Sequence, residues 1–291
     1  MEITRESVRE GLRRARYWTT PRTEIVLFLA LATDKPLLVE GPPGAGKTEL
    51  AKVLADILAT DLIRLQCYEG LDESKALFEW NYAKQLLRLQ SDRERPWGEI
   101  SADIFSAEFL LARPLLAAIR APRPVVLLID EVDKADEEFE AFLLEVLSDF
   151  QVSIPELGTL RATHRPAVVL TSNRARELSE ALRRRCAYLY LDFPGPEIER
   201  QIVEAKVPNV DSALAEHVAR FVDALRRLDL HKAPSIAETL DWARALVALG
   251  IRELDATAVR QTLSLLLKQE DDAVRGGAKA GELVAASKPR S

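Results

Sequence analysis

The chain is poor in the residue types that build metal centres and covalent cross-links. Among its 291 residues there are two cysteines, Cys67 and Cys186, which lie far apart and form no CxxC pair. The three histidines are scattered along the chain. A zinc site needs several such ligands at short spacing, and a disulfide framework needs a set of paired cysteines. The sequence therefore indicates neither a zinc centre nor a disulfide scaffold.

Long apolar runs and an excess of positive charge are missing as well. No apolar segment reaches the roughly 20 residues of a transmembrane helix. The first twenty residues, MEITRESVREGLRRARYWTT, are too charged for a secretory signal peptide. The net charge of −6 argues against a large nucleic-acid surface. We therefore expect a cytoplasmic protein with no membrane span, for which nucleic acid is an unfavoured partner.

What the chain does have is a regular alternation of apolar segments with helical patterns. Its hydrophobic content of 47% and charged content of 30% suit a soluble globular protein. Strands that alternate with helices predict an α/β fold with a doubly wound parallel sheet. The strand-like segments are 36–40, 62–67, 124–131, 167–173 and 187–193.

The pattern changes after PGP at 194–196, where helical stretches follow without a convincing strand. We expect an α/β core over 1–195, a smaller all-α domain over 196–271 and a flexible polar tail over 272–291. Within the core we expect four further features, which are a helix over 1–20, an insertion with a helix over 70–90, a helix over 106–121 and a hairpin over 151–166.

The strongest local signal is GPPGAGKT at 41–48, which fits the phosphate-binding motif G-x-x-x-x-G-K-[ST]. A strand-like segment precedes it and a helical pattern follows, as the motif requires. Glycines let successive N–H groups reach phosphate oxygens, Lys47 places a charge between the β- and γ-phosphates, and Thr48 offers its hydroxyl to Mg²⁺. The residues expected to bind ATP are Gly41, Pro42, Pro43, Gly44, Ala45, Gly46, Lys47, Thr48 and Glu49.

Two carboxylates end the buried strand VVLLIDE. Asp130 and Glu131 come at its carboxyl end, where open α/β sheets bind their ligands. We expect Asp130 to hold Mg²⁺ through water and Glu131 to polarise the attacking water. A third strand, VVLTSN, ends in Asn173, whose amide either contacts the γ-phosphate or serves as an ordinary turn residue.

These motifs in this order resemble an AAA+ ATPase: GPPGAGKT, LLIDEVDKA, VVLTSN, ALRRRC and then a helical lid. The hairpin at 151–166 resembles the pre-sensor insertion of one AAA+ branch, and DKADEEFEAFLLEVLSDFQVSI and ARPLLAAI resemble the MoxR group. QCYEGLDESKALFEWNYAKQLL looks most like the MoxR-type ATPases associated with the maturation of carbon monoxide dehydrogenase, which is a molybdenum hydroxylase. The resemblance implies ATP hydrolysis in a hexameric ring. It also implies chaperone-like remodelling of a metalloenzyme client, together with a partner that carries a von Willebrand A domain.

The resemblance also carries roles to individual residues. Asn173 corresponds to the first sensor. In ALRRRC the arginine before the cysteine, Arg185, corresponds to the arginine finger that reaches the γ-phosphate of the neighbouring subunit. A comparison with branch-migration motors favours Arg183 instead, so Arg183 and Arg184 stay behind Arg185 as candidates. The alternative is a solvated basic helix end that suits the helix dipole.

Two regions leave the assignment open. MoxR-like proteins usually have an arginine after the proline of the lid motif, but HKAPSIAET has Ser235 there. Lys232 supplies the charge instead, or Arg244 does, or Lys232 is merely solvated. The insertion at 70–90 faces the central pore of the ring with Trp80 exposed, or its aromatic residues belong to the core.

Other function classes share parts of this pattern. A nucleic-acid-dependent AAA+ motor shares the hairpin, but the acidic charge argues against it. A small-molecule P-loop phosphotransferase shares the phosphate-binding loop, but it needs neither ALRRRC nor a helical lid. A nucleotide-gated binding module without turnover does not explain Glu131.

Overall fold

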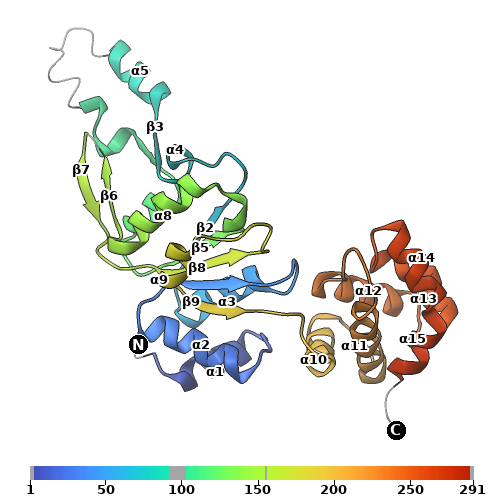
Figure 1. The fold of residues 1–291 in the computed structure, drawn as a ribbon. Coiled ribbons are helices and arrows are strands. Elements are labelled where there is room, and N and C mark those ends of the chain that lie inside the picture. Colours follow the sequence, from blue (N-terminus) through green and yellow to red (C-terminus); the bar gives the residue numbers. More distant parts are fainter. Residues whose placement is uncertain (1–2, 92–102, 155, 289–291) are drawn as a thin grey trace. The chain divides into compact units, whose positions relative to one another are not determined.

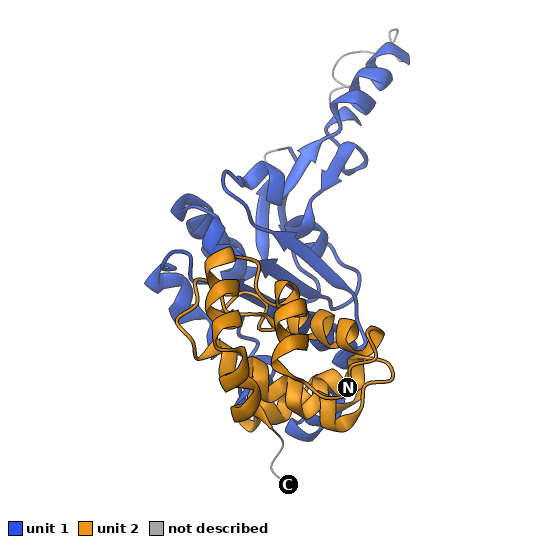
Figure 2. Ribbon diagram, turned by 90° about the vertical axis from the view of Figure 1, so that its right-hand side faces the viewer, with its two compact units in different colours: residues 1–11, 22–40, 47–190 blue, residues 12–21, 41–46, 191–291 orange. Residues whose placement is uncertain are grey.

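The fold is described by a computed structural model that covers residues 3–91, 103–154 and 156–288. These residues form two compact units, which Figure 2 distinguishes, each with its own hydrophobic core. None of their helices combines the length and the apolar character that a membrane crossing requires. Unit 1 comprises residues 1–11, 22–40 and 47–190, and unit 2 comprises residues 12–21, 41–46 and 191–291.

Unit 1 is built on a five-stranded sheet in the order β2-β5-β8-β1-β9, in which every neighbouring pair is parallel (Figure 1). All residues of β1 and β5 are buried, which their continuous apolar sequences require in a sheet covered on both faces. The expected α/β fold with a parallel sheet is confirmed. The strands are β1 (Leu37–Glu40), β2 (Leu62–Gln66), β5 (Val126–Asp130), β8 (Ala167–Ser172) and β9 (Ala187–Tyr190).

Helices pack on this sheet and begin where the sequence provides caps. The Asp136 side chain accepts a hydrogen bond from the Phe139 amide and so starts α8 (Glu137–Asp149), whose first turn is acidic. Ser179 caps α9 (Glu180–Arg185) in the same way. The remaining helices of this part of the chain are α1 (Arg5–Arg14), α2 (Pro21–Ala32), α3 (Lys47–Ile57), α4 (Glu73–Ala76), α5 (Tyr82–Ser91) and α7 (Pro114–Ile119), with 3-10 turns at Ala107–Phe109 and Val132–Lys134.

The segment expected to be one helix over 106–121 is different. Residues Leu110–Ala112 form strand β4, and α7 begins only at Pro114. A proline disfavours helical backbone in the residue before it, and Arg113 is extended accordingly. Strand β4 pairs antiparallel with β3 (Phe78–Trp80) between α4 and α5, so the insertion at 70–90 contains a strand as well as helices. The hairpin is formed by β6 (Gln151–Ile154) and β7 (Gly158–Arg161).

The prediction of an exposed Trp80 is wrong. Its side chain is 9% exposed, because strand β3 turns it into the core of unit 1. There its ring meets Phe105 edge to face at 5.4 Å between centroids, a favourable arrangement for aromatic pairs. The exposed aromatic residue of the insertion is Tyr82, at 62%.

Unit 2 contains a bundle of helices around Phe221 and Trp242, whose ring centroids lie 5.1 Å apart. Ser235 and Glu238 form a capping box that starts α12, so the sequence SIAE encodes this helix start. The helices are α10 (Pro196–Lys206), α11 (Ser212–Arg226), α12 (Ile236–Ala248), α13 (Ala256–Thr262), α14 (Glu270–Ala278) and α15 (Ala280–Ser287), with a 3-10 turn at Leu263–Leu265.

Two expectations about the ends of the chain need correction. The tail expected to be flexible over 272–291 instead contains most of α14 and all of α15. Leu283 and Val284 join the core of unit 2, and this burial offsets the cost of ordering a segment rich in small residues. The helix expected over 1–20 ends at Arg14, since Arg16 adopts a left-handed conformation at φ 52°.

Candidate active site

The loop between β1 and α3 depends on glycine at two points. Gly44 has φ 78°, and a Cβ there would lie 2.3 Å from the Ser235 Cβ. At Gly41 a Cβ would lie 1.9 Å from the carbonyl oxygen of Leu191. No other residue fits either position, so these glycines permit the backbone conformation in which successive N–H groups can reach a phosphate. Within it, the Ala45 amide donates to the Pro42 carbonyl oxygen at 3.3 Å.

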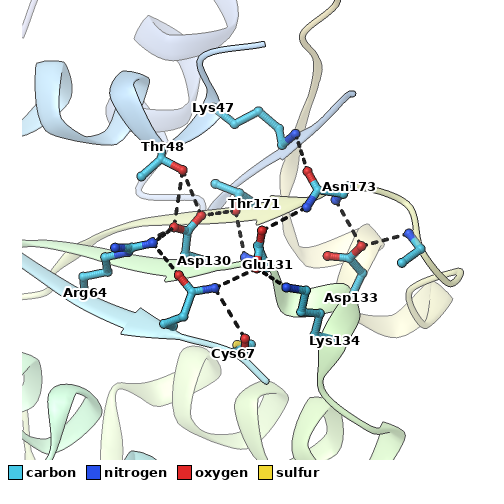
Figure 3. Close-up of polar contacts among 12 residues, drawn as sticks. Lys47, Thr48, Arg64, Cys67, Asp130, Glu131, Asp133, Lys134, Thr171 and Asn173 are labelled. Atoms are coloured by element: carbon cyan, nitrogen blue, oxygen red, sulfur yellow. Dashed lines mark hydrogen bonds and ion pairs between the residues drawn. The ribbon is translucent and has the colours of Figure 1, made fainter. Parts of the chain in front are cut away.

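The lysine that follows the loop points to the end of strand β8 (Figure 3). Lys47 is buried, and its Nζ donates to Oδ1 of Asn173 at 2.7 Å. Burial lowers the pKa of Lys47, while the carboxylates of Asp133, Asp130 and Glu131 act in the opposite direction. These neighbours favour a charged ammonium group, which is the form that attracts phosphate.

A hydroxyl and a carboxylate converge beside this lysine. Thr48 donates to the two carboxylate oxygens of Asp130 at 3.1 and 3.3 Å. Asp130 is also held by Thr171 at 2.5 Å and by Nε of Arg64 at 3.0 Å. Mg²⁺ prefers hard oxygen ligands, and these two side chains place such oxygens together. The residues present therefore fit a magnesium ion.

Glu131 is held through both carboxylate oxygens. Its Oε2 accepts a hydrogen bond from the Gln66 amide at 2.9 Å and lies 2.6 Å from Nζ of Lys134. Its Oε1 accepts a hydrogen bond from the Asn173 amide at 3.2 Å. The residue stands in a left-handed conformation at φ 56° just after β5. Such conformations cluster at functional sites, where the surrounding contacts maintain them.

Asp133 fixes the loop that follows β8. One of its carboxylate oxygens accepts hydrogen bonds from the backbone amides of Asn173 at 3.1 Å and Ala175 at 2.8 Å. The other oxygen, Oδ1, is buried and has no hydrogen-bond partner within the described part of the chain. Asp133 thus fixes the backbone of Asn173, whose side chain contacts Lys47 and Glu131.

Several residues of this cluster were absent from the predicted site: Arg64, Gln66, Asp133, Lys134 and Thr171. The signal for two of them lies in strand register. Gln66 ends β2 directly opposite Asp130, and Thr171 lies near the end of β8. Parallel strands bring their carboxyl ends to one edge of a sheet. A prediction of strand order would therefore have identified both residues.

The three consecutive arginines have different surroundings. Arg184 pairs with Glu180 one turn away at 2.5 Å, on the exposed surface of α9. Arg183 lies 3.9 Å from the buried carboxylate of Glu40. The exposed Arg185 side chain has no hydrogen bond or ion pair among residues 3–91, 103–154 and 156–288. None of the three forms a hydrogen bond or ion pair with Lys47 or Glu131 within the described chain.

Among the described residues, the side chains of Lys232 and Arg244, the candidates for the second sensor, form no hydrogen bond or ion pair with the phosphate-binding loop. Lys232 is exposed, and its backbone amide donates to Asp272 at 3.1 Å. Arg244 pairs with Asp241 at 2.9 Å. The lid residue that approaches the loop is Ser235, which packs on Gly44, and the following Ile236 amide donates to the Gly44 carbonyl oxygen at 3.4 Å. Glu49, also expected in the site, pairs with Lys52 on α3.

Comparison with known proteins identifies this arrangement. The model of the "ATPase family associated with various cellular activities (AAA)" matches residues 37–191, which contain the loop, both carboxylates and Asn173. The chain belongs to the AAA family of ATPases. It therefore binds and hydrolyses ATP.

Relatives place the chain more narrowly. Protein CbbQ of Hydrogenophilus thermoluteolus is 26% identical over 243 residues, which cover 82% of this chain and 85% of CbbQ. CbbQ is a MoxR-family AAA+ ATPase, and the resemblance to the MoxR type is confirmed. Spastin of Anopheles gambiae is 27% identical over 82% of this chain and 26% of its own length.

A solved structure of the RuvB Holliday junction branch migration motor of Thermotoga maritima gives a TM-score of 0.47 at 18% identity. It covers 91% of this chain and 70% of RuvB. A likeness at this level assigns no RuvB activity to this chain.

Proposed function

We propose that this ATPase is a MoxR-type remodelling enzyme that works as a hexameric ring on a metalloenzyme client. A molybdenum-containing dehydrogenase is the proposed client, and a protein with a von Willebrand A domain is the proposed partner. AAA+ ATPases typically assemble into rings, and the resemblance of residues 66–87 to maturation ATPases supports this class of client. The cytoplasmic location expected from the sequence stays a prediction.

The observation that carries the proposal is the convergence of Lys47, Glu131 and Asn173 at one edge of the sheet. Hydrolysis of a phosphoryl bond requires little covalent chemistry from the protein and relies on positioning and charge. Lys47 is assigned to the β- and γ-phosphates, Asn173 to the γ-phosphate, and Glu131 to the water that attacks it. Thr48 and Asp130 would hold Mg²⁺, which neutralises the phosphate charge when it is bound.

Gln66, Lys134 and Asn173 donate to the two oxygens of Glu131 and lower its basicity, because hydrogen bonds and a positive charge stabilise the ionised carboxylate. Release of one of these donors would make Glu131 a stronger base for the attacking water. We assign this release to the arrival of the γ-phosphate, because that group competes for the Asn173 amide and the Lys47 ammonium. Binding of ATP would then prepare Glu131 to polarise the water that attacks the γ-phosphate.

Arg185 is proposed as the finger that completes the site of the neighbouring subunit. Its two neighbours already have carboxylate partners within their own chain, whereas Arg185 is exposed at the end of α9. An arginine supplied in trans stabilises the charge of the transition state and is worth about 10³ to 10⁵ in rate. Hydrolysis would thereby depend on assembly.

The sharpest test mixes two inactive variants. Arg185→Ala keeps an intact Glu131, and Glu131→Gln keeps an intact Arg185, so a mixed ring contains sites in which both groups meet. We expect each variant alone to assemble and bind ATP with little hydrolysis, and the mixture to recover part of the parent rate. Recovery would not occur if Arg185 acted within its own subunit.

Arg123→Ala is the matched control for the loss of an exposed arginine, since Arg123 pairs with the exposed Asp61. It should hydrolyse ATP like the parent. Light scattering in ATP provides the second check. A monomer would support a phosphotransferase, and hydrolysis stimulated by DNA in a salt-sensitive way would support a nucleic-acid motor.

The client can be sought with Glu131→Gln, which should keep ATP and hold its substrate. We expect a protein with a von Willebrand A domain or a molybdenum hydroxylase to co-purify from native extract in the presence of ATP. Lys47→Ala, which should not retain ATP, is the control that captures neither. Equal capture by both variants would contradict an ATP-dependent remodelling cycle.

A further inference from the structure

A buried carboxylate stands directly before the phosphate-binding loop. Glu40 is the last residue of β1 and is 2% exposed, between β8 on one side and β9 on the other. An ionised carboxylate is tolerated in such a place only when donors and positive charges compensate it. The function assigned above gives this residue no role.

Three side chains gather around one oxygen of this carboxylate. The Tyr188 hydroxyl donates to Oε2 of Glu40 at 2.9 Å. Nε of Arg174 lies 3.5 Å from the same atom, and a terminal nitrogen of Arg183 lies 3.9 Å from it. These residues come from β9, from the loop after β8 and from α9. One carboxylate therefore joins the start of the phosphate-binding loop to three separate segments of unit 1.

Each arginine is also held from a second side. The guanidinium of Arg183 lies over the Tyr188 ring at 5.5 Å from its centroid, and that of Arg174 lies over the Tyr190 ring at 5.8 Å. Both distances are within the range of cation–π attraction. The side chain of Arg174 is 58% exposed, so its position depends on these specific contacts and not on burial.

Arg174 is the residue that follows Asn173, and its backbone is left-handed at φ 61°. This conformation is unfavourable for a residue with a side chain and persists where neighbouring contacts impose it. The Arg174 amide donates to Oγ of Ser172, and its side chain is directed to Glu40. Together with the Asp133 carboxylate, which accepts from the Asn173 and Ala175 backbone amides, these contacts hold the turn from which the Asn173 side chain reaches Lys47 and Glu131.

We propose that Glu40 is a positioning residue for ATP hydrolysis, which acts through Arg174 to hold Asn173 at the reacting end of the nucleotide. Arg183 anchors the same carboxylate to α9. A small displacement of a group that orients the reacting atoms lowers the rate of the chemical step without weakening the binding of the remaining substrate. This role rests on the function proposed above for Asn173 and does not depend on which client the ATPase acts on.

The test compares Glu40→Gln and Arg174→Gln. Glutamine keeps the size of Glu40 and an oxygen that accepts from Tyr188, but it removes the charge that holds the arginines. For each variant we expect kcat to fall by about tenfold to a hundredfold, with the parental Kd for ATP, melting temperature and oligomer size. Arg123→Gln, which removes an exposed arginine paired with Asp61, is the matched control and should keep the parent kcat.

The double variant Glu40→Gln/Arg174→Gln should lose no more than the more impaired single variant, because both changes interrupt the same contact. Parental kcat in both single variants, losses that multiply in the double variant, or a loss that follows a weaker Kd or a smaller oligomer would each overturn the proposal. If Glu40→Gln does not fold, Arg174→Gln is sufficient, because the Arg174 side chain is mostly exposed and its loss should not prevent folding. A reduced kcat at unchanged Kd in Arg174→Gln supports the proposal, and an unchanged kcat overturns it.

Discussion

The two units each bury a cluster of charged side chains, and the clusters are built in opposite ways. In unit 2, Arg226 binds Glu199 through two hydrogen bonds of 2.5 and 2.8 Å, with side-chain exposures of 8% and 0%. In unit 1, the buried Asp130 is paired with Arg64, whose side chain is 51% exposed. Because both Arg226 and Glu199 are shielded from water, this ion pair is expected to keep a single geometry.

The cluster in unit 1 has partners that can leave. The long side chains of Arg64 and Lys134 reach the carboxylates from the solvent side and return to water at little cost. The Asp130 side chain itself stays buried at the sheet edge, and that of Glu131 is 30% exposed. In both clusters the carboxylate of Asp130 or Glu199 is buried, but Arg64 is exposed and Arg226 is not. The exposure of the arginine therefore distinguishes a site whose ion pairs can open from a structural ion pair.

The largest expected effect concerns Glu131. Glu131→Gln should lower kcat by about a hundredfold to ten-thousandfold, because a positioned general base contributes that much. ATP affinity and the free energy of unfolding should stay near the parent values, since the amide keeps the shape and removes a negative charge among carboxylates. Steady-state hydrolysis, nucleotide titration and urea unfolding measure the three quantities. A large loss in the free energy of unfolding would show that Glu131, like the Arg226–Glu199 pair, mainly stabilises the fold.

Arg226→Met should produce the opposite result. Removal of one partner leaves the Glu199 carboxylate buried and uncompensated, which costs about 3 to 5 kcal/mol in the free energy of unfolding. Urea unfolding followed by circular dichroism measures the loss. The double variant Glu199→Gln/Arg226→Met should recover most of it, because no buried charge remains. If the single variant were as stable as the parent, the contrast between the units would be wrong.

Gln66→Ala should change the rate of ATP hydrolysis less than Glu131→Gln does, and in the opposite direction. Loss of the Gln66 amide removes one of the donors that hold Glu131, so basal hydrolysis should rise by about tenfold, the lower end of what one hydrogen bond to a charged group is worth. Hydrolysis without client at saturating ATP is the measurement. A fall in this rate would indicate that Gln66 aligns the base and does not restrain it.

The smallest expected effect is at the cysteines. Burial raises the pKa of Cys67 and of Cys186 to about 12, so both remain thiols at neutral pH. Because the thiolate is the reactive form, iodoacetamide at pH 8 should leave the native protein unlabelled and should label both residues after unfolding in urea. Mass spectrometry reads the result. Rapid labelling of native Cys67, which lies next to Gln66 at the site, would reveal an unexpected opening there.

Much of the fold could be predicted from the sequence because its signals are local. Apolar runs such as VVLLIDE predict buried strands, and glycines at Gly41 and Gly44 permit a loop that no other residue could form. Prediction failed where a distant contact decides. Trp80 lies in a pattern that fits a helix or a strand, and its pairing partner β4 is thirty residues away in the sequence. Ala280 and Leu283 are ordered only because the core of unit 2 accepts them.

The sequence by itself determined the chemistry that this protein can perform. The order of a phosphate-binding loop, an acidic strand end and a polar strand end specifies an ATPase, because backbone conformation and side-chain type are encoded residue by residue. The tertiary structure decided which groups work together. The register of β2, β5 and β8 brings Gln66 and Thr171 to the carboxylates, and the ends of β1 and β9 give Arg183 a partner in Glu40 that Arg185 lacks within the described chain. Such pairings arise between residues far apart in the chain, so only the folded packing reveals them.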